Sequence, residues 1–290
     1  MLPLFRICAP YDWYGSFVPR LSPFASLLSA MPSAPETVLL TGASSGIGRA
    51  LAHRFAQAGS TCILLARSED ALHTLADTLR AEYAVDAHVL PADLAAPDAG
   101  DTVETALREQ GLTVDVLVNN AGFGARGAFA DLDAEEQRAM IRVNVLALTD
   151  LARRLLPGML ERNRGGILNV ASTAAFQPGP YMSVYYATKA YVLSFSDGLA
   201  AEVADTSVTV TCLAPGPTRT AFVDKADMGE TPLFQWTAPM SADAVAQAGY
   251  DAFRRGRPLV VPGLPNKIGA FLIRFTPRPV ARTVTAWLNT

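Results

Sequence analysis

The segment TGASSGIG, Thr41 to Gly48, decides the fold because it closes one apolar run and opens a helical pattern. The run TVLLTG is β-branched and aliphatic, which is typical of a buried strand. The run GIGRALAHRFAQAG carries apolar residues at helical spacing and stops at Gly59. Glycines at 42, 46 and 48 permit a tight turn whose following helix points its amides outward. The segment is therefore predicted to be a strand-to-helix turn that can hold a phosphate.

The same alternation of strand and helix continues along the chain. Further strands are predicted for TCILLA, AHVLPAD, VDVLVNN, GGILNVAS, SVTVTCLAPG and PLVVPG. Helices are predicted over 68–83, 98–110, 134–162, 183–203 and 243–254, with Pro157 kinking or dividing the longest one. Strands that are apolar on both faces indicate a doubly wound parallel α/β sheet covered by helices on both sides. In this setting the glycine turn favours a dinucleotide site. The alternative is a tight strand-to-helix connection that binds no ligand, which would explain the glycines equally well if they are taken by themselves.

Composition excludes several classes of protein. The chain has 290 residues, half of them hydrophobic, and a formal net charge of −3 without a basic run, so a nucleic-acid partner is not expected. The cysteines, Cys8, Cys62 and Cys212, are far apart and suit neither a disulfide framework nor a metal site. The longest apolar run, near 268–273, is cut by Arg274 and is too short to span a membrane. A soluble, cytoplasmic protein is expected.

The sequence pattern divides the chain into three segments. Residues 1–34 contain prolines and isolated aromatic residues without any period, so a disordered arm or an upstream start is expected there. Residues 35–262 hold the alternating pattern. The tail, residues 263–290, is helical in pattern, basic, and broken by Pro277 and Pro279. It could cover a pocket, pack on another subunit or rest on a membrane surface, and its short apolar stretches put the membrane last.

The glycine spacing Gly-x-x-x-Gly-x-Gly resembles that of the short-chain dehydrogenase/reductase family in its single-domain form. Further motifs follow in the family's order: NNAG at 119–122, Asn144 in RVNV, Ser172 at the end of a strand, Tyr185 and Lys189 in Tyr-x-x-x-Lys, and PG at 215–216 followed by Thr218 and Thr220. The resemblance covers about 37–261. It implies a Rossmann-type catalytic domain that transfers hydride between a nicotinamide cofactor and a carbonyl or alcohol, without a metal.

The resemblance also implies which residues bind the cofactor. They are Gly42, Ser44, Ser45, Gly46, Ile47, Gly48, Arg67, Ser68, Asp93, Leu94, Asn120, Ala121, Gly122, Tyr185, Lys189, Pro215, Gly216, Thr218 and Thr220. No acid stands at Leu65 or Ala66, where one would bind the ribose diol, and Arg67 follows at once. We therefore expect NADP(H), with a solvated arginine as the alternative.

Four residues are implied to be catalytic. Tyr185 would donate or accept the proton, Lys189 would lower the pKa of Tyr185 and hold the ribose, and Ser172 would bind the reacting oxygen. Asn144 would position a water that connects Lys189 to solvent. Taken singly, Asn144 could be an amide on a helix surface, Ser172 the cap of a strand, and Lys189 a solvated charge. Tyr186 is expected to be a packing residue that tolerates Phe, because the Tyr-x-x-x-Lys spacing and the interval from Ser172 select Tyr185.

The substrate is not specified by any residue. Apolar side chains near the site favour an apolar pocket, with core packing as the alternative for each of them: Phe222, Phe234 and Trp236 in a predicted covering segment at 221–236, and Phe176, Pro178, Tyr181 and Met182. A carbonyl reductase or alcohol dehydrogenase is favoured over a non-catalytic Rossmann sensor of the nicotinamide ratio. An epimerase or dehydratase of the extended family would need other glycine spacing and a longer C-terminal domain. The resemblance implies a homodimer or homotetramer.

Overall fold

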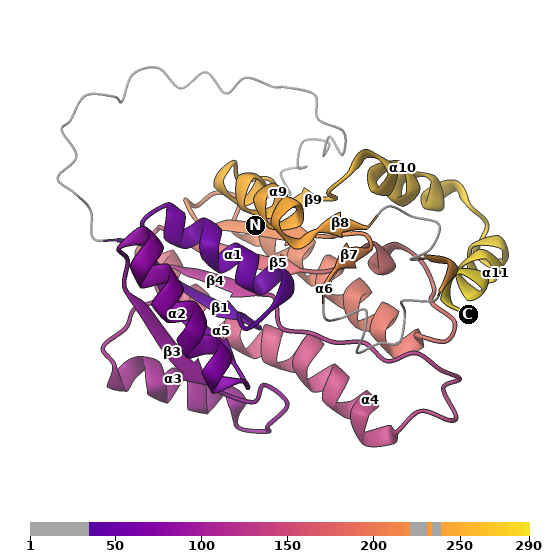
Figure 1. Cartoon of the computed structure of the whole chain (residues 1–290). Helices are drawn as coiled ribbons and strands as arrows, with labels where there is room; N and C mark the ends of the chain where they lie inside the picture. Colours follow the sequence, from indigo (N-terminus) through magenta and orange to yellow (C-terminus); the bar gives the residue numbers. More distant parts are fainter. Residues whose placement is uncertain (1–34, 221–230, 234–238) are drawn as a thin grey trace, which may run out of the picture. The chain divides into compact units, whose positions relative to one another are not determined.

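Seven parallel strands form the central sheet of the computed structural model, in the order β3-β2-β1-β4-β5-β6-β9 (Figure 1). Their bounds are β1 Thr37–Thr41, β2 Thr61–Ala66, β3 Ala87–Pro91, β4 Val116–Asn119, β5 Gly166–Val170, β6 Thr209–Leu213 and β9 Leu259–Val260. The structure describes residues 35–220, 231–233 and 239–290. The predicted arm at 1–34 and the aromatic residues Phe222, Phe234 and Trp236 lie outside the described residues.

Helices cover both faces of the sheet because successive strand residues point to opposite sides. Val38 and Leu40 of β1 pack with α1 (Gly46–Gln57), α2 (Glu69–Tyr83) and α9 (Ala242–Arg254). Leu39 packs on the other side, in a core shared with α3 (Ala99–Glu109), α5 (Leu148–Glu161) and α6 (Ser183–Glu202). The predicted Rossmann-type, doubly wound sheet is therefore confirmed.

The long helix predicted over 134–162 is divided, but not by its proline. It consists of α4 (Ala134–Ile141), a π-helical turn η1 (Arg142–Ala147) and α5, which continues through Pro157. A proline removes one backbone hydrogen bond without ending a helix that packing holds in place. The wider turn brings the Asn144 side chain into the interior, where its hydrogen bonds offset the irregular backbone.

The order in which strands are added to the parallel sheet changes sides at β1. Strands β2 and β3 follow on one side of β1, whereas β4, β5 and β6 follow on the other. In a parallel sheet the loops after neighbouring strands meet at one edge, and a crevice forms where the strand order reverses. The turns after β1 and β4 are therefore brought together there.

Two helices follow the sheet at the C-terminus. The helix α10 (Leu264–Leu272) runs into the short turn η3 (Ile273–Phe275), and α11 (Arg278–Asn289) completes the chain. Pro277 and Pro279 lie where the helices separate, since Pro277 precedes α11 and Pro279 occupies its first turn. Strands β7 (Thr218–Arg219) and β8 (Met240–Ser241) pair in parallel, which the sequence pattern did not predict. None of the helices among the described residues is long and apolar enough to cross a membrane.

Candidate active site

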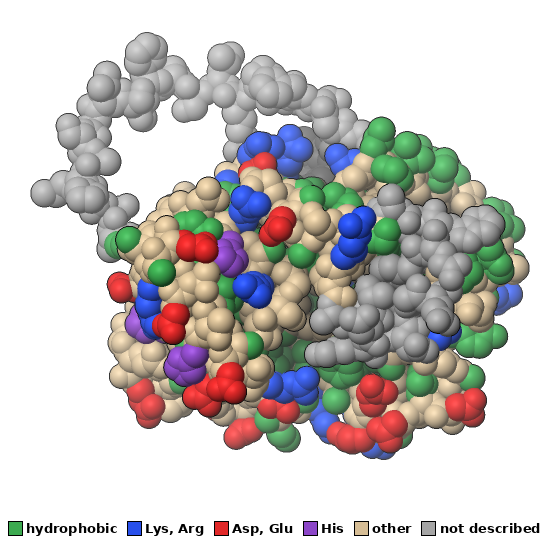
Figure 2. All heavy atoms as spheres, viewed as in Figure 1, with side chains coloured by type: hydrophobic (Ala, Val, Ile, Leu, Met, Phe, Trp, Pro, Cys, Tyr) green, Lys and Arg blue, Asp and Glu red, His purple; other side chains and the backbone are tan. Residues whose placement is uncertain are grey.

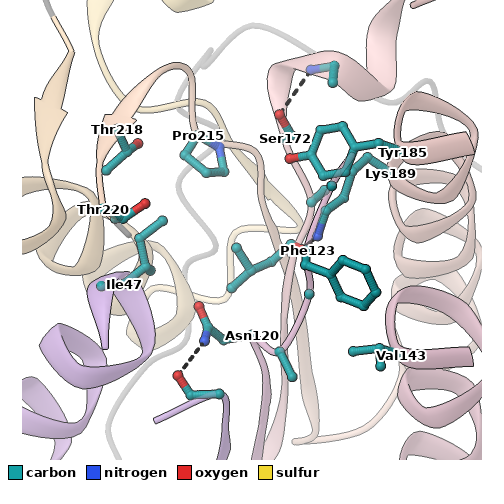
Figure 3. A pocket seen from close by; sticks show the side chains of 18 of the residues that line it. Ile47, Asn120, Phe123, Val143, Ser172, Tyr185, Lys189, Pro215, Thr218 and Thr220 are labelled. Carbon is teal, nitrogen blue, oxygen red and sulfur yellow. Dashed lines mark hydrogen bonds between the residues drawn. The ribbon is translucent and has the colours of Figure 1, made fainter. Parts of the chain in front are cut away.

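A pocket of about 700 Å³ opens at the carboxyl ends of the strands. Its walls come from the loops after β1, β2, β3, β4, β5 and β6 and from the first turns of α6. In Figure 3, Ser172, Tyr185 and Lys189 lie together on one side, whereas Ile47, Pro215, Thr218 and Thr220 lie on the other. Segments separated by more than a hundred residues in the sequence thus form one cavity.

The glycine turn is held open by a neighbouring asparagine. Asn120 donates from Nδ2 to the carbonyl oxygens of Thr41 (3.0 Å) and Gly42 (3.2 Å). The Thr41 hydroxyl accepts from the backbone amides of Asn120 and Ala121 at 2.9 and 3.0 Å. A β-carbon on Gly48 would lie 2.3 Å from the Gly42 oxygen and 2.4 Å from Asn120 Nδ2, so only glycine fits there. The result is a cradle at the N-terminus of α1, which suits a pyrophosphate.

The structure places most of the predicted cofactor residues on the pocket wall. The lining includes Gly42, Ser44, Ser45, Gly46, Ile47, Arg67, Asp93, Leu94, Asn120, Ala121, Gly122, Tyr185, Lys189, Pro215, Gly216, Thr218 and Thr220. Gly48 lies behind the turn, and Ser68 precedes the first residue of α2. The cradle therefore fits the pyrophosphate of a dinucleotide, and Arg67 lines the same pocket directly after β2.

Tyr185 and Ser172 lie together on the opposite wall (Figure 3). Ser172 lies in extended backbone just before the short turn η2 (Thr173–Phe176), and its hydroxyl accepts from the Ala174 amide at 3.1 Å. Burial raises the pKa of Tyr185 to about 12, while the nearby Ser172 hydroxyl lowers it in part. The lowering of this pKa that the resemblance implies also needs an oxidised nicotinamide and stays a prediction, because in the protein alone burial of the phenolate raises the pKa.

Lys189 is buried beside the tyrosine. Its Nζ donates to the Val170 carbonyl oxygen at 2.8 Å and lies 5.9 Å from the centre of the Tyr185 ring. Burial lowers the pKa of Lys189 to about 8, because the ammonium has lost most of its water. The two groups expected to exchange protons thus face one cavity, on adjacent turns of α6.

Asn144 lies behind the pocket wall, where its side chain fixes a loop. Its Nδ2 donates to the Phe123 carbonyl oxygen at 2.9 Å and to Thr188 Oγ1 at 3.0 Å. Its Oδ1 accepts from the Phe123 amide at 3.1 Å. Both amide hydrogens are used by protein groups, so only the second lone pair of Oδ1 remains for a water. A β-carbon on Gly122 would lie near both Asn144 Oδ1 (3.0 Å) and Lys189 Nζ (3.3 Å), so the two side chains are neighbours.

Tyr186 packs in the interior, as predicted, and its hydroxyl also forms a hydrogen bond that the sequence did not predict. It is buried, and its hydroxyl donates to Asn289 Oδ1 at 3.2 Å. Asn289 is the last residue of α11, and its Nδ2 donates to the Pro180 carbonyl oxygen at 2.9 Å. A hydroxyl in α6 is therefore bound to the last turn of α11, 103 residues away.

The expected apolar wall is only partly correct. Met182 lines the pocket, but Phe176 packs into the core and Tyr181 is exposed. Phe123 and Val143 also line the pocket, from the loop after β4 and from η1, and neither was predicted from the sequence. Phe123 follows NNAG directly and could have been found from that position, whereas nothing in the pattern predicted the π-helical turn that carries Val143.

Comparisons with known proteins agree with this geometry. A family model described as short chain dehydrogenase matches residues 36–231. The uncharacterized oxidoreductase YvrD of Bacillus subtilis is 39% identical over 185 residues, which cover 64% of this chain and 69% of the relative. A short-chain dehydrogenase from Sphingobium yanoikuyae, solved in complex with NADPH, is 36% identical with a TM-score of 0.74, covering 81% of this chain and 92% of that one. A Burkholderia phymatum family member in complex with NAD is 26% identical with a TM-score of 0.72, covering 82% of this chain and 92% of that one.

Proposed function

The chain belongs to the short-chain dehydrogenase family of oxidoreductases, and we propose that it is an NADP(H)-dependent enzyme that reduces a carbonyl compound with Tyr185 as the general acid. The observation that carries the proposal is that Ser172, Tyr185 and Lys189 lie together on one pocket wall, which faces the glycine cradle. A non-catalytic nicotinamide sensor would have no use for a hydroxyl pair and a buried lysine in that place.

Each side chain has a distinct task in the proposed reaction. When bound, the reduced nicotinamide supplies a hydride to the carbonyl carbon. Ser172 donates a hydrogen bond to the carbonyl oxygen, and the Tyr185 phenol gives its proton to that oxygen as negative charge develops there. Burial raises the pKa of Tyr185 to about 12. A phenol is protonated at neutral pH at its ordinary pKa as well, and this is the form that reduction requires.

Lys189 and Asn144 support the phenol. The Lys189 ammonium faces the Tyr185 ring and would stabilise the phenolate left after proton transfer. The second lone pair of Asn144 Oδ1 would hold a water through which Lys189 returns a proton from solvent. In the oxidative direction the phenol would have to lose its proton first, and the positive charge of an oxidised nicotinamide would lower its pKa.

The choice of tyrosine is tested by exchanging each neighbour in turn. Tyr185→Phe should lower ketone-dependent NADPH oxidation by about 10²- to 10⁴-fold, because the proton donor is lost. Tyr186→Phe is the matched control and should retain most of the activity. The measurement is NADPH absorbance with a panel of ketones and aldehydes. Activity that survives in Tyr185→Phe would contradict the mechanism, and NADPH binding without turnover on any carbonyl would favour the sensor.

The preference for NADP(H) rests on Arg67. We expect Arg67→Ala to weaken NADPH binding by roughly 10- to 100-fold and to leave NADH binding nearly unchanged, since one charge-assisted contact with the 2′-phosphate is lost. Arg108→Ala, an exposed arginine of α3, is the control. The dissociation constants come from fluorescence titration. An unchanged ratio of the two constants would assign Arg67 to solvent.

The substrate that we propose is an apolar carbonyl compound. Phe123, Val143, Met182 and Leu233 line the same pocket as the Ser172 and Tyr185 hydroxyls, and they offer a substrate little besides apolar contact.

We further propose that the protein is a cytoplasmic homodimer or homotetramer. The buried, unpaired thiols of Cys62 and Cys212 support a reducing compartment.

A further inference from the structure

The first helix of the tail carries an exposed apolar stripe. Leu264, Ile268, Phe271, Leu272 and Phe275 are all exposed, and Phe275 has 72% of its surface accessible. Their spacing of four, seven, eight and eleven residues places them within roughly 100° of one another on a helix. The short apolar stretches of the sequence therefore form one continuous stripe along α10 and η3.

The second helix is built in the same way. Val280, Val284 and Trp287 are about half exposed and stand at helical spacing on the outside of α11. Its inner side is buried through Ala281, Thr285 and Asn289. Figure 2 shows hydrophobic side chains gathered over α10 and again over α11.

The charges on this part of the chain have a single sign. Lys267, Arg274, Arg278 and Arg282 are all exposed, and residues 258–290 contain no Asp or Glu. The protein as a whole is acidic, with a net charge of −3, so the tail stands out against it. Exposed apolar side chains next to basic ones are typical of helices that lie in the interface of an anionic membrane.

We propose that the outer surface of α10, η3 and α11, defined by Leu264, Ile268, Leu272, Phe275, Val280, Val284, Trp287 and the four basic residues, docks on a membrane containing anionic lipid. A second copy of the chain is a poorer occupant. Symmetric pairing of this surface would bring eight basic side chains together without a carboxylate from either tail. Lipid phosphates carry the charge opposite to that of the tail's basic side chains, and acyl chains would cover the apolar stripe.

The inner sides of the same helices touch the pocket rim. A β-carbon on Gly216, which lines the pocket, would lie 2.3 Å from Asn266 of α10. Asn289 of α11 bonds Tyr186 and the backbone of Pro180. Docking would therefore hold the pocket beside the bilayer, where an apolar carbonyl compound is concentrated.

The test measures lipid binding alone, so its outcome is separate from that of the proposed reaction. The full chain is sedimented with vesicles of phosphatidylcholine, and with vesicles of equal parts phosphatidylcholine and phosphatidylglycerol, at low and high salt. We expect binding to the anionic vesicles that weakens with salt. Lys267→Gln with Arg282→Gln should weaken it at least tenfold, at about fivefold for each basic charge removed.

A pair of phenylalanines supplies the matched control. Phe275→Ser should weaken vesicle binding, whereas Phe129→Ser should not, although Phe129 is 67% exposed. No binding to anionic vesicles, or equal binding by all variants, would overturn the proposal. It would also be overturned if light scattering showed that the Phe275 or the Lys267 and Arg282 substitutions dissociate an oligomer, since the surface would then be a protein interface.

Discussion

Tyr185 and Lys189 have pKa values that burial moves in opposite directions. A phenolate and an ammonium both lose solvation in the pocket wall, so the neutral form of each is favoured. The sequence spacing predicted an ammonium that would make the phenol more acidic. In the protein alone, burial has the largest effect on Tyr185 and raises its pKa. The pKa of the Tyr185 phenol therefore depends on its burial as well as on the Tyr-x-x-x-Lys spacing that places Lys189 beside it.

The pKa of Lys189 predicts a dependence of stability on pH. Its value is about 8 in the folded chain and 10.5 ordinarily. Between these two pH values the unfolded chain keeps a proton that the folded chain has lost, so stability rises with pH. Relative to Lys189→Met, the wild type should gain up to about 3 kcal/mol in unfolding free energy from pH 8 to above pH 10.5. Urea denaturation across this range measures it, and parallel curves for the two proteins would show that Lys189 titrates normally.

At the scale of elements, the strand-to-helix turn after β1 is a close fit between backbones. Gly42 and Gly46 have positive φ values of 65° and 55°, which favour glycine. Gly48 has ordinary helical geometry, and its constraint is the contact with Gly42 and Asn120. The glycine pattern therefore combines two requirements: left-handed backbone at two positions and close approach at the third.

Two glycine substitutions separate these effects from helix propensity. Gly48→Ala should abolish measurable NADPH binding, because the new methyl group displaces Gly42 and Asn120 from the cradle. Gly198→Ala in α6 meets no atom within 4 Å and should stabilise the helix by about 0.5–1 kcal/mol. Fluorescence titration and thermal unfolding check the two outcomes. Normal NADPH affinity in Gly48→Ala would mean that the cradle does not hold the cofactor.

At the scale of the whole molecule, the chain end supports the catalytic helix. Asn289 is fully buried and joins α11 to Tyr186 and to the segment before α6. Arg126, in the loop after β4, donates to the Asn289 carbonyl oxygen at 3.5 Å. The tail therefore has an inner side that fixes the pocket wall and an outer side that we assign to lipid.

A double-mutant cycle measures this link. Tyr186→Phe should lower the unfolding free energy by about 1–3 kcal/mol, because the buried Asn289 oxygen loses its donor. The loss should be smaller in an Asn289→Ala background, with a coupling energy of at least about 0.5 kcal/mol. Tyr191→Phe, whose hydroxyl meets Thr149 at an exposed site, should change stability by about 0.5 kcal/mol or less. Equal losses in both backgrounds would show that the hydrogen bond contributes nothing.

The sequence by itself determined the sheet, its helices and the glycine turn, because these follow from apolar periodicity and from the backbone freedom of glycine at positions close together in the chain. The identities of Ser172, Tyr185 and Lys189 also followed from motif spacing, and the structure brings all three to one pocket. Only the tertiary structure decided the direction in which burial moves the Tyr185 pKa, the bond between Tyr186 and Asn289, and which side of the tail helices is left exposed. Each of these depends on burial or on contact between distant segments, and the free energy of such contacts is invisible in a local pattern.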